Sequence, residues 1–297
     1  MRITGSTALV TGANRGLGAR LVAELLAGGA AKVYATARSP LSIDLTVSND
    51  PRVHTLALDV TDQASVDAAV VAASDVNLLV NNAGVLGFGS ALAGDIDLFG
   101  RDMETNYIGT IRVSRAFVPV LESNGPAAIA NVLTLIALAP VGPMAGYSAS
   151  KAAAHSFTQA LRAEVRTRDI EVVGAYPGGI DTDMLAGVDA DKAAPEEVAR
   201  RIVAGIAAGD TVIWPDDASE GAGKVYLGDP IQLERIWPAS WYSARALHLR
   251  RRATVHTSTY DTKPLPRRRS AGSMARRRAR EGEAMTTDSL IDRRTAD

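Results

Sequence analysis

Short apolar runs and longer amphipathic segments alternate along the first 214 residues of the chain. Apolar runs of about 4–8 residues that end at turn residues are typical of buried strands, and apolar positions at helical spacing are typical of helices. The pattern predicts seven strands, at residues 6–11, 32–37, 53–58, 77–81, 128–134, 170–176 and 211–214.

The segments between these strands predict helices at residues 17–26, 62–73 and 96–121, and two more that begin near Tyr147 and at Pro195. Glycines 28 and 29 are expected to end the first helix, and Thr61 is the expected N-cap of the second. Because strands alternate with helices, we predict an α/β fold of the Rossmann type. It would be one doubly wound parallel sheet of about seven strands with helices on both faces.

The charge of the chain changes after Trp237. Residues 1–237 carry 18 Lys and Arg against 27 Asp and Glu, whereas residues 238–297 carry 14 against 6. The second segment has three runs of three arginines and few apolar residues, which is typical of disorder. We predict one domain at 1–237 and a basic, disordered extension at 238–297. A solvated extension is favoured over a nucleic-acid contact, because basic runs bind polyanions without specificity.

Several classes of site are excluded by composition. The chain has no cysteine, which excludes disulfides and thiolate chemistry, and its histidines at 54, 155, 248 and 256 lack metal-ligand spacing. The longest apolar run, 127–139, is too short to span a bilayer. We therefore expect a cytoplasmic protein with no membrane segment and no metal.

A glycine-rich loop joins the first predicted strand to the first predicted helix. Gly12, Gly16 and Gly18 follow the strand directly. In a strand-loop-helix context such glycines permit a tight turn and let a dinucleotide pyrophosphate approach the helix N-terminus. A purely structural turn is the less favoured alternative.

The second strand bears on the choice of cofactor. An acidic residue at its end would accept a ribose 2′-hydroxyl and indicate NAD, but Arg38 stands there instead. Arg38, with Arg15 from the glycine loop, could pair with a 2′-phosphate. We predict a preference for NADP(H) over NAD(H). The alternative is that both arginines are solvated surface charges.

Tyr147 and Lys151 are four residues apart, which places them on one face of a helix. A nearby ammonium favours the ionised form of a phenol, so we expect Lys151 to lower the pKa of Tyr147 toward neutrality. Such a tyrosine can donate and accept a proton. Taken alone, the pair is more often a surface contact.

With these motifs in order, the chain resembles the short-chain dehydrogenase/reductase family, in its single-domain form. The resemblance covers roughly residues 3–215 and includes Asp59-Val60, Asn81-Asn82-Ala83-Gly84 and Pro177-Gly178 besides the motifs above. It implies that Tyr147 is the general acid or base and that Lys151 tunes it and binds the nicotinamide ribose. It also implies that Asn106 holds a water in a proton relay. The family's usual serine is replaced here by Thr134, whose methyl group takes up space beside the substrate carbonyl.

The resemblance implies one cofactor site built from all of these motifs. Its expected residues are Gly12, Asn14, Arg15, Gly16, Leu17, Gly18, Arg38, Asp59, Val60, Asn81, Ala83, Gly84, Tyr147, Lys151, Pro177, Gly178, Ile180 and Thr182.

The loops at 85–94, 135–146 and 184–194 should enclose the substrate, and their apolar composition suits a small, mainly apolar carbonyl or alcohol. Asp181 and Asp183 are expected to be turn or cap residues. We predict an NADP(H)-dependent oxidoreductase that forms a homodimer or homotetramer. The alternative is an NADP(H)-binding regulator or pseudoenzyme without turnover.

Overall fold

One parallel sheet organises the described part of the chain. The computed structural model describes residues 1–43 and 49–237, and its strands pair in the order β3-β2-β1-β4-β5-β6-β7. They are β1 Thr7–Val10, β2 Lys32–Ala37, β3 Val53–Ala57, β4 Leu78–Asn81, β5 Ala127–Val132, β6 Ile170–Ala175 and β7 Val212–Ile213. The predicted fold class is confirmed, and the strand ends differ from the predicted ones by at most two residues.

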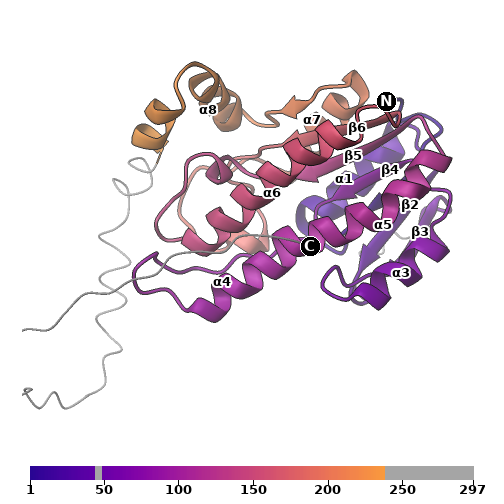
Figure 1. Ribbon diagram of the computed structural model, residues 1–297, viewed down its shortest axis with the longest axis horizontal. Helices are drawn as coiled ribbons and strands as arrows, with labels where there is room; N and C mark the ends of the chain where they lie inside the picture. Colours follow the sequence, from indigo (N-terminus) through magenta and orange to yellow (C-terminus); the bar gives the residue numbers. More distant parts are fainter. Residues whose placement is uncertain (44–48, 238–297) are drawn as a thin grey trace, which may run out of the picture. The chain divides into compact units, whose positions relative to one another are not determined.

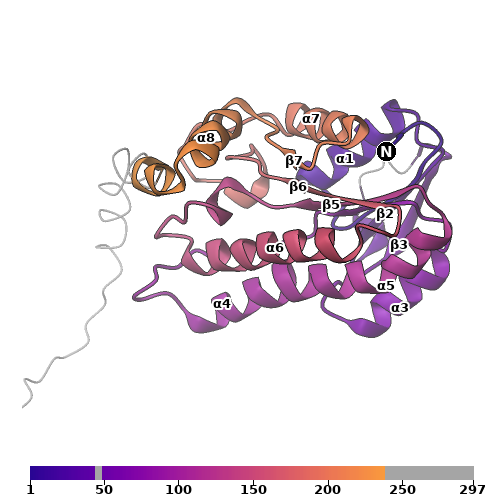
Figure 2. The same cartoon turned by 45° about the horizontal axis from the view of Figure 1, so that its top comes forward.

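Helices cover both faces of this sheet (Figures 1 and 2). They are α1 Gly16–Ala27, α3 Gln63–Ala72, α4 Ile96–Met103, α5 Gly109–Ser123, α6 Ala145–Glu164, α7 Pro195–Ala208 and α8 Asp217–Gly228. In Figure 2, α1 and α7 lie on one side of the sheet, and α3, α5 and α6 lie on the other.

The core has two halves because successive strand residues point to opposite faces. Ala8 and Val10 of β1 belong to the apolar cluster that includes Ile202 of α7. Leu9, between them, belongs to the cluster that includes Phe117 of α5. Both halves are buried, and the central strands β4 and β5 are accordingly buried along their whole length, without alternation.

The strand order reverses between β1 and β4. From β1 the chain continues outward to β2 and β3, and it then returns to pair β4 on the other side of β1. In open parallel sheets, ligands bind in the crevice at the carboxyl edge where the order reverses. The loops after β1 and β4 are therefore the expected position of a binding site.

One helix boundary was predicted wrongly. Asp62, not Thr61, is the N-cap of α3, because its carboxylate accepts from the N–H groups of Ala64 and Ser65 at 3.1 and 3.3 Å. Thr61 instead donates through its backbone and hydroxyl to Asp59 at 2.9 and 2.7 Å. The Thr61 hydroxyl is thus hydrogen-bonded to Asp59 and does not cap the helix.

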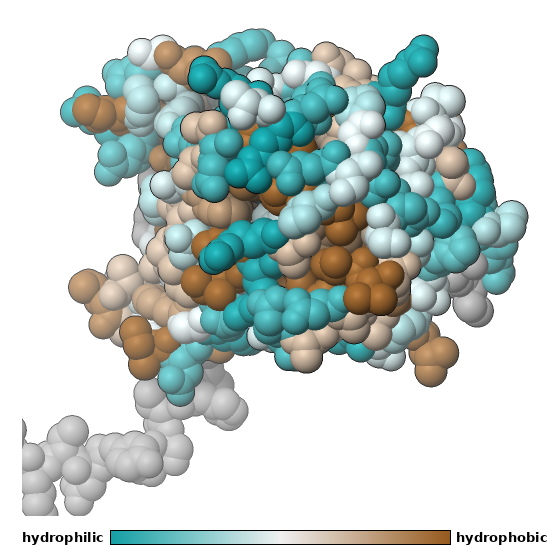
Figure 3. Space-filling model, turned by 45° about the vertical axis from the view of Figure 1, so that its right-hand side comes forward, coloured by the Kyte–Doolittle hydropathy of each residue, from teal (hydrophilic) through white to brown (hydrophobic). Residues whose placement is uncertain are grey.

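The predicted basic extension at 238–297 lies outside the described residues, as do His248 and His256. Among the described helices, none is long and apolar enough to cross a membrane. Figure 3 shows one side of the molecule, on which apolar side chains gather near the centre and hydrophilic ones surround them.

Candidate active site

A cavity of about 980 Å³ lies where the sequence and topology predict it. The loops after β1, β2, β3, β4, β5 and β6 enclose it, together with residues from α4 and α6 and with Trp237. Most of the predicted site residues line it. They are Gly12, Asn14, Arg15, Gly16, Leu17, Gly18, Arg38, Asp59, Val60, Ala83, Gly84, Thr134, Tyr147, Lys151, Pro177, Gly178, Ile180 and Thr182.

The glycine loop is shaped by close backbone packing. Gly12 has φ +66°, and a Cβ there would lie 2.9 Å from Ala83 Cα in the loop after β4. A Cβ on Gly18 would collide with the Gly12 carbonyl. Only glycine fits at both positions, so the loop stays narrow and brings the N-terminus of α1 to the edge of the cavity.

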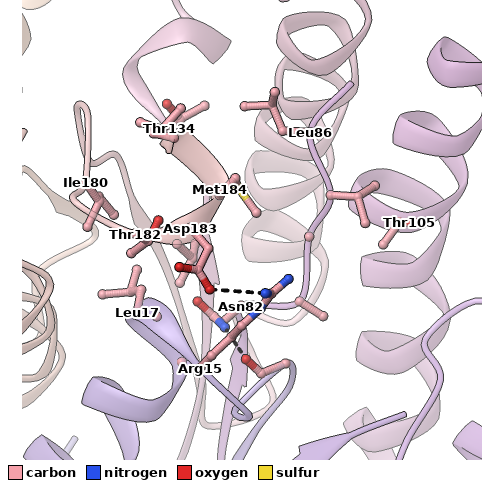
Figure 4. A pocket seen from close by; sticks show the side chains of 18 of the residues that line it. Arg15, Leu17, Asn82, Leu86, Thr105, Thr134, Ile180, Thr182, Asp183 and Met184 are labelled. Carbon is pink, nitrogen blue, oxygen red and sulfur yellow. Dashed lines mark hydrogen bonds and ion pairs between the residues drawn. The ribbon is translucent and has the colours of Figure 1, made fainter. Parts of the chain in front are cut away.

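Two arginines line this part of the cavity. Arg38 follows β2. The pKa of Asp59 is lowered chiefly by the hydrogen bonds from Thr61, and the charge of Arg38 lowers it further. Arg15 forms an ion pair with Asp183, which belongs to the segment after β6 (Figure 4). Asp181 pairs with Lys192 at 3.6 Å. Both aspartates therefore act as ion-pair partners and not as an acid/base pair.

The two asparagines at the end of β4 have different roles: Asn81 is the last residue of the strand, and Asn82 follows it. The Asn82 amide donates to the carbonyls of Thr11 and Gly12 at 2.9 and 3.1 Å, which ties the loop after β4 to the glycine loop. Asn81, predicted to lie along the cofactor, points into the core instead. Its amide donates to Ser114 and Asn131, both at 2.9 Å, so its side chain joins the sheet to α5 and does not line the cavity.

Asn106 interrupts the helix predicted at 96–121. A π-helical turn at Glu104–Ile108 separates α4 from α5, and such turns occur often at functional sites. The Asn106 side chain is buried, and it accepts from the Val85 N–H and donates to the Val85 carbonyl and to Ser150. It holds the loop after β4 against α6, and it is not among the residues that line the cavity.

Tyr147 and Lys151 both lie in α6, which begins at Ala145, and both side chains are buried. The Lys151 Nζ donates to the Val132 carbonyl at 2.8 Å and lies 5.9 Å from the centre of the Tyr147 ring. The spacing thus places the two groups side by side, as predicted.

The predicted direction of the Tyr147 pKa shift is wrong for this structure. Burial, with a smaller contribution from the Asp102 carboxylate, raises the pKa of Tyr147 above its usual value. Burial also lowers the pKa of Lys151 to about 8. The ammonium is directed at the Val132 carbonyl, so desolvation outweighs its attraction for a phenolate. At neutral pH the phenol is therefore protonated, the state required of a proton donor.

Thr134 lies directly after β5 at the cavity wall (Figure 4). It is the N-cap of the short helix Leu135–Ala137, and its Oγ1 accepts from the Ile136 N–H at 3.5 Å. This is a long, weak contact, which leaves the hydroxyl hydrogen available to donate elsewhere.

The end of the cavity beside Tyr147 is apolar. Tyr147 belongs to a buried cluster with Ile136, Val141 and Met144, and Leu86, Leu185 and Trp237 pack against it. The three predicted substrate loops each contribute to this wall, since Leu86, Ile136 and Leu185 belong to them in turn. Among the described residues, no group of three or more acidic or histidine side chains could hold a metal ion.

Comparison with known proteins identifies the family. A family model described as short chain dehydrogenase matches residues 6–193. The chain belongs to the short-chain dehydrogenase family. The matched region contains the glycine loop, Asn81 and Asn82 at the end of β4, and the Tyr147–Lys151 pair.

Three relatives of this short-chain dehydrogenase illustrate the range of the family. A short chain dehydrogenase from Burkholderia cenocepacia, solved in complex with NADP, is 38% identical with a TM-score of 0.75, covering 79% of this chain and 98% of its own. A 3-ketoacyl-(acyl-carrier-protein) reductase from Brucella melitensis, complexed with NADH, is 27% identical with a TM-score of 0.63, covering 69% and 91%. The uncharacterized oxidoreductase DltE of Bacillus subtilis is 33% identical over 190 residues, which are 62% of this chain and 75% of DltE.

Sequence reasoning missed Trp237 and Arg101, which line the cavity of this short-chain dehydrogenase, and Asp102, which is buried and does not line it. Trp237 lay at the edge of the predicted domain, where no motif marks a pocket residue. Asp102 is fully buried although it lies in an exposed-looking helix segment with Arg101 and Glu104 nearby. Its position three residues after Phe99 on the same helical face was the available signal, because such positions share a packing surface.

Proposed function

We propose that the chain is an NADP(H)-dependent oxidoreductase that interconverts a carbonyl and an alcohol, with Tyr147 as the general acid or base. The observation that carries this proposal is the meeting of a glycine loop, Arg38 and the Tyr147–Lys151 pair around one cavity. No other group of side chains in the described residues combines a nucleotide-binding loop with a proton donor of this kind.

The residues of the cavity fit a nicotinamide dinucleotide. A Cβ at Gly12 would clash with Ala83, and one at Gly18 with the Gly12 carbonyl, so the two glycines let the loop pack closely. The N-terminus of α1 then lies at the cavity, where it could bind a pyrophosphate. Asp59 and Val60 line the cavity near Arg38, where an adenosine half would lie. Pro177, Ile180 and Thr182 also line the cavity, and they would enclose the nicotinamide end.

The preference for NADP(H) rests on Arg38 and Arg15. Both line the cavity, and no carboxylate ends β2 to accept a ribose 2′-hydroxyl. The Burkholderia cenocepacia relative was solved with NADP, which supports this choice, whereas the Brucella melitensis relative was solved with NADH. The two arginines of this chain, and not the relatives, are the reason for the proposal.

The cofactor would supply or accept the hydride, and the protein would donate or accept the proton. Tyr147 is buried and protonated at neutral pH, so it would donate its proton to the carbonyl oxygen during reduction. Thr134 would donate a second hydrogen bond to the same oxygen. Lys151 would stabilise the negative charge of the phenolate that forms, because its ammonium lies beside the ring.

The substrate we propose is small and mainly apolar, because the wall beside Tyr147 is built from Leu86, Ile136, Met144 and Leu185. We further propose that the chain acts in the cytoplasm as a homodimer or homotetramer. The apolar area in Figure 3 supports association, since subunit interfaces bury surfaces of this kind.

A panel of ketones and aldehydes with NADPH, followed by the loss of cofactor absorbance, tests the proposal. We expect turnover by the wild type and a loss of at least about 100-fold in Tyr147→Phe, because general acid catalysis contributes about that much. NADPH binding should survive in the variant. If both proteins bind NADPH and neither turns over any carbonyl, the chain is a cofactor-binding regulator or pseudoenzyme instead.

A further inference from the structure

Asp102 is a buried carboxylate that the proposed mechanism does not use. It lies near the end of α4, and its side chain has no exposed surface. Burying a charge is costly unless hydrogen bonds compensate for it, so a fully buried aspartate calls for a structural or functional reason. Burial accordingly raises its pKa above the usual value for an aspartate.

The hydrogen-bond partner of Asp102 lies in the wall of the cavity. Its Oδ2 accepts from the Gly87 N–H at 3.0 Å. Gly87 directly follows Leu86, which lines the cavity and packs against the buried cluster that includes Tyr147. The loop after β4 is thus attached to α4 at the point where it forms the apolar wall beside the catalytic phenol.

The packing around this contact is tight. A Cβ on Gly87 would lie 3.1 Å from both Asp102 Oδ2 and Leu98 Cβ, and 3.4 Å from Arg101 Nη2. The absence of a side chain at Gly87 therefore lets the loop lie directly on α4. Arg101 itself lines the cavity, and its Nη2 lies 3.5 Å from Asp102 Oδ1.

The same face of α4 contacts the start of α6. Phe99, one turn before Asp102, packs so closely on Gly146 that any Cβ there would collide with its ring. Gly146 precedes Tyr147. Two charged or titratable groups face Asp102 closely enough to interact with it, Arg101 from its own helix and Tyr147 from α6. Asp102 therefore lies where the loop after β4, α4 and the catalytic end of α6 meet.

We propose that Asp102 is a positioning residue of the substrate end: through Gly87 it fixes the Leu86 wall beside Tyr147, and through Arg101 it orients a cation that lines the cavity. It touches neither the cofactor nor the reacting atoms. This inference rests on the proposed function for its effect on turnover, but the anchoring of the loop is a property of the protein alone.

Two variants separate the hydrogen bond from other effects of the side chain. Asp102→Asn keeps an oxygen that can accept from Gly87, whereas Asp102→Leu fills the same space without an acceptor. In the full chain, hydrogen exchange at the Gly87 amide should be close to wild type in Asp102→Asn. It should be at least about tenfold faster in Asp102→Leu, because a bond to a charged acceptor is lost.

Turnover with the carbonyl panel supplies the second measurement. We expect Asp102→Leu to lose about tenfold or more in kcat/KM for the carbonyl, with an NADPH Kd within about twofold of wild type, and Asp102→Asn to restore most of the loss. A merely structural defect would weaken NADPH binding as well.

Each outcome decides one part of the proposal. Unchanged Gly87 exchange in folded Asp102→Leu overturns the anchoring, whether or not any substrate is found. Faster exchange with unchanged kcat/KM overturns the positioning role. A wild type that binds NADPH and reduces nothing, with Gly87 exchange responding as expected, refutes the proposed function and leaves the anchoring confirmed.

Discussion

Arg15 Nη1 lies 3.1 Å from Asp183 Oδ2, an ion pair that connects the glycine loop to the segment after β6 across the cofactor edge of the cavity. The two side chains are 72% and 75% exposed, so the pair contributes only about 0–1 kcal/mol to stability. Arg15 is also one of the two cations proposed for the 2′-phosphate. A bound phosphate would therefore compete with Asp183 for the same guanidinium.

We expect Asp183→Asn to tighten NADPH binding by about two- to fivefold, because the loss of a weak surface pair releases Arg15. Fluorescence titration with NADPH and with NADH measures the effect. Asp181→Asn is the matched control, since Asp181 lies in the same segment, is similarly exposed and pairs with Lys192. An equal gain for NADH, or in the control, would show a general charge effect and not competition for the 2′-phosphate.

Arg38→Ala should weaken NADPH by about tenfold or more and NADH by less than about twofold. A guanidinium-phosphate hydrogen bond is worth roughly 1.5–3 kcal/mol, and NADH has no phosphate at this position. Paired Kd values for the two cofactors test this directly. Equal weakening of both would refute the assignment of Arg38 to the 2′-phosphate.

Thr134 offers a test of the second hydrogen bond to the substrate oxygen. Thr134→Val keeps the shape but lacks the hydroxyl, and kcat should fall by about 100-fold, the usual effect of removing one oxyanion donor. Thr134→Ser keeps the hydroxyl and removes a methyl group beside the carbonyl, so its kcat should equal or exceed the wild-type value, most clearly for bulky ketones. Loss of activity in Thr134→Ser as well would refute this role of the hydroxyl, because serine keeps both the hydroxyl and the cap of Leu135–Ala137.

Much of this fold could be predicted from the sequence because strand and helix patterns are local. The glycine loop, the strand ends and the Tyr147–Lys151 spacing each depend on residues close together in the chain, and their joint position at the carboxyl edge follows from parallel pairing. The N-cap of α3 was missed because Asp62 and Thr61 are both good caps, and only the hydrogen bonds of Asp59 decide between them.

The remaining differences between expectation and structure concern contacts between distant segments. Asn81 could bind a cofactor or pair with Asn131, 50 residues away, and spacing alone does not distinguish the two. The pKa of Tyr147 depends on its burial and on the Asp102 carboxylate. Both effects arise because α4, which carries Asp102, packs against α6. A rule based on the nearest cation in sequence therefore gave the wrong direction.

The buried ammonium of Lys151 makes a prediction about stability. Its pKa is about 8 in the folded protein and about 10.4 in an unfolded chain. Below pH 8 both states are protonated, and the folded state bears the cost of burying the charge. Between these two pKa values the folded state has lost its proton while the unfolded state keeps it, so this cost disappears as the pH rises.

Lys151→Met lacks this titration and retains a side chain of similar length. As the pH rises from 7 to 10, the free energy of unfolding of the wild type should therefore increase relative to that of the variant by about 2–3 kcal/mol. Urea unfolding at several pH values measures the difference, in which the other titrating groups largely cancel. Lys224→Met, at an exposed lysine of α8, is the control for the loss of a lysine side chain as such. A difference for Lys151→Met that does not change with pH would mean that the ammonium of Lys151 is not desolvated.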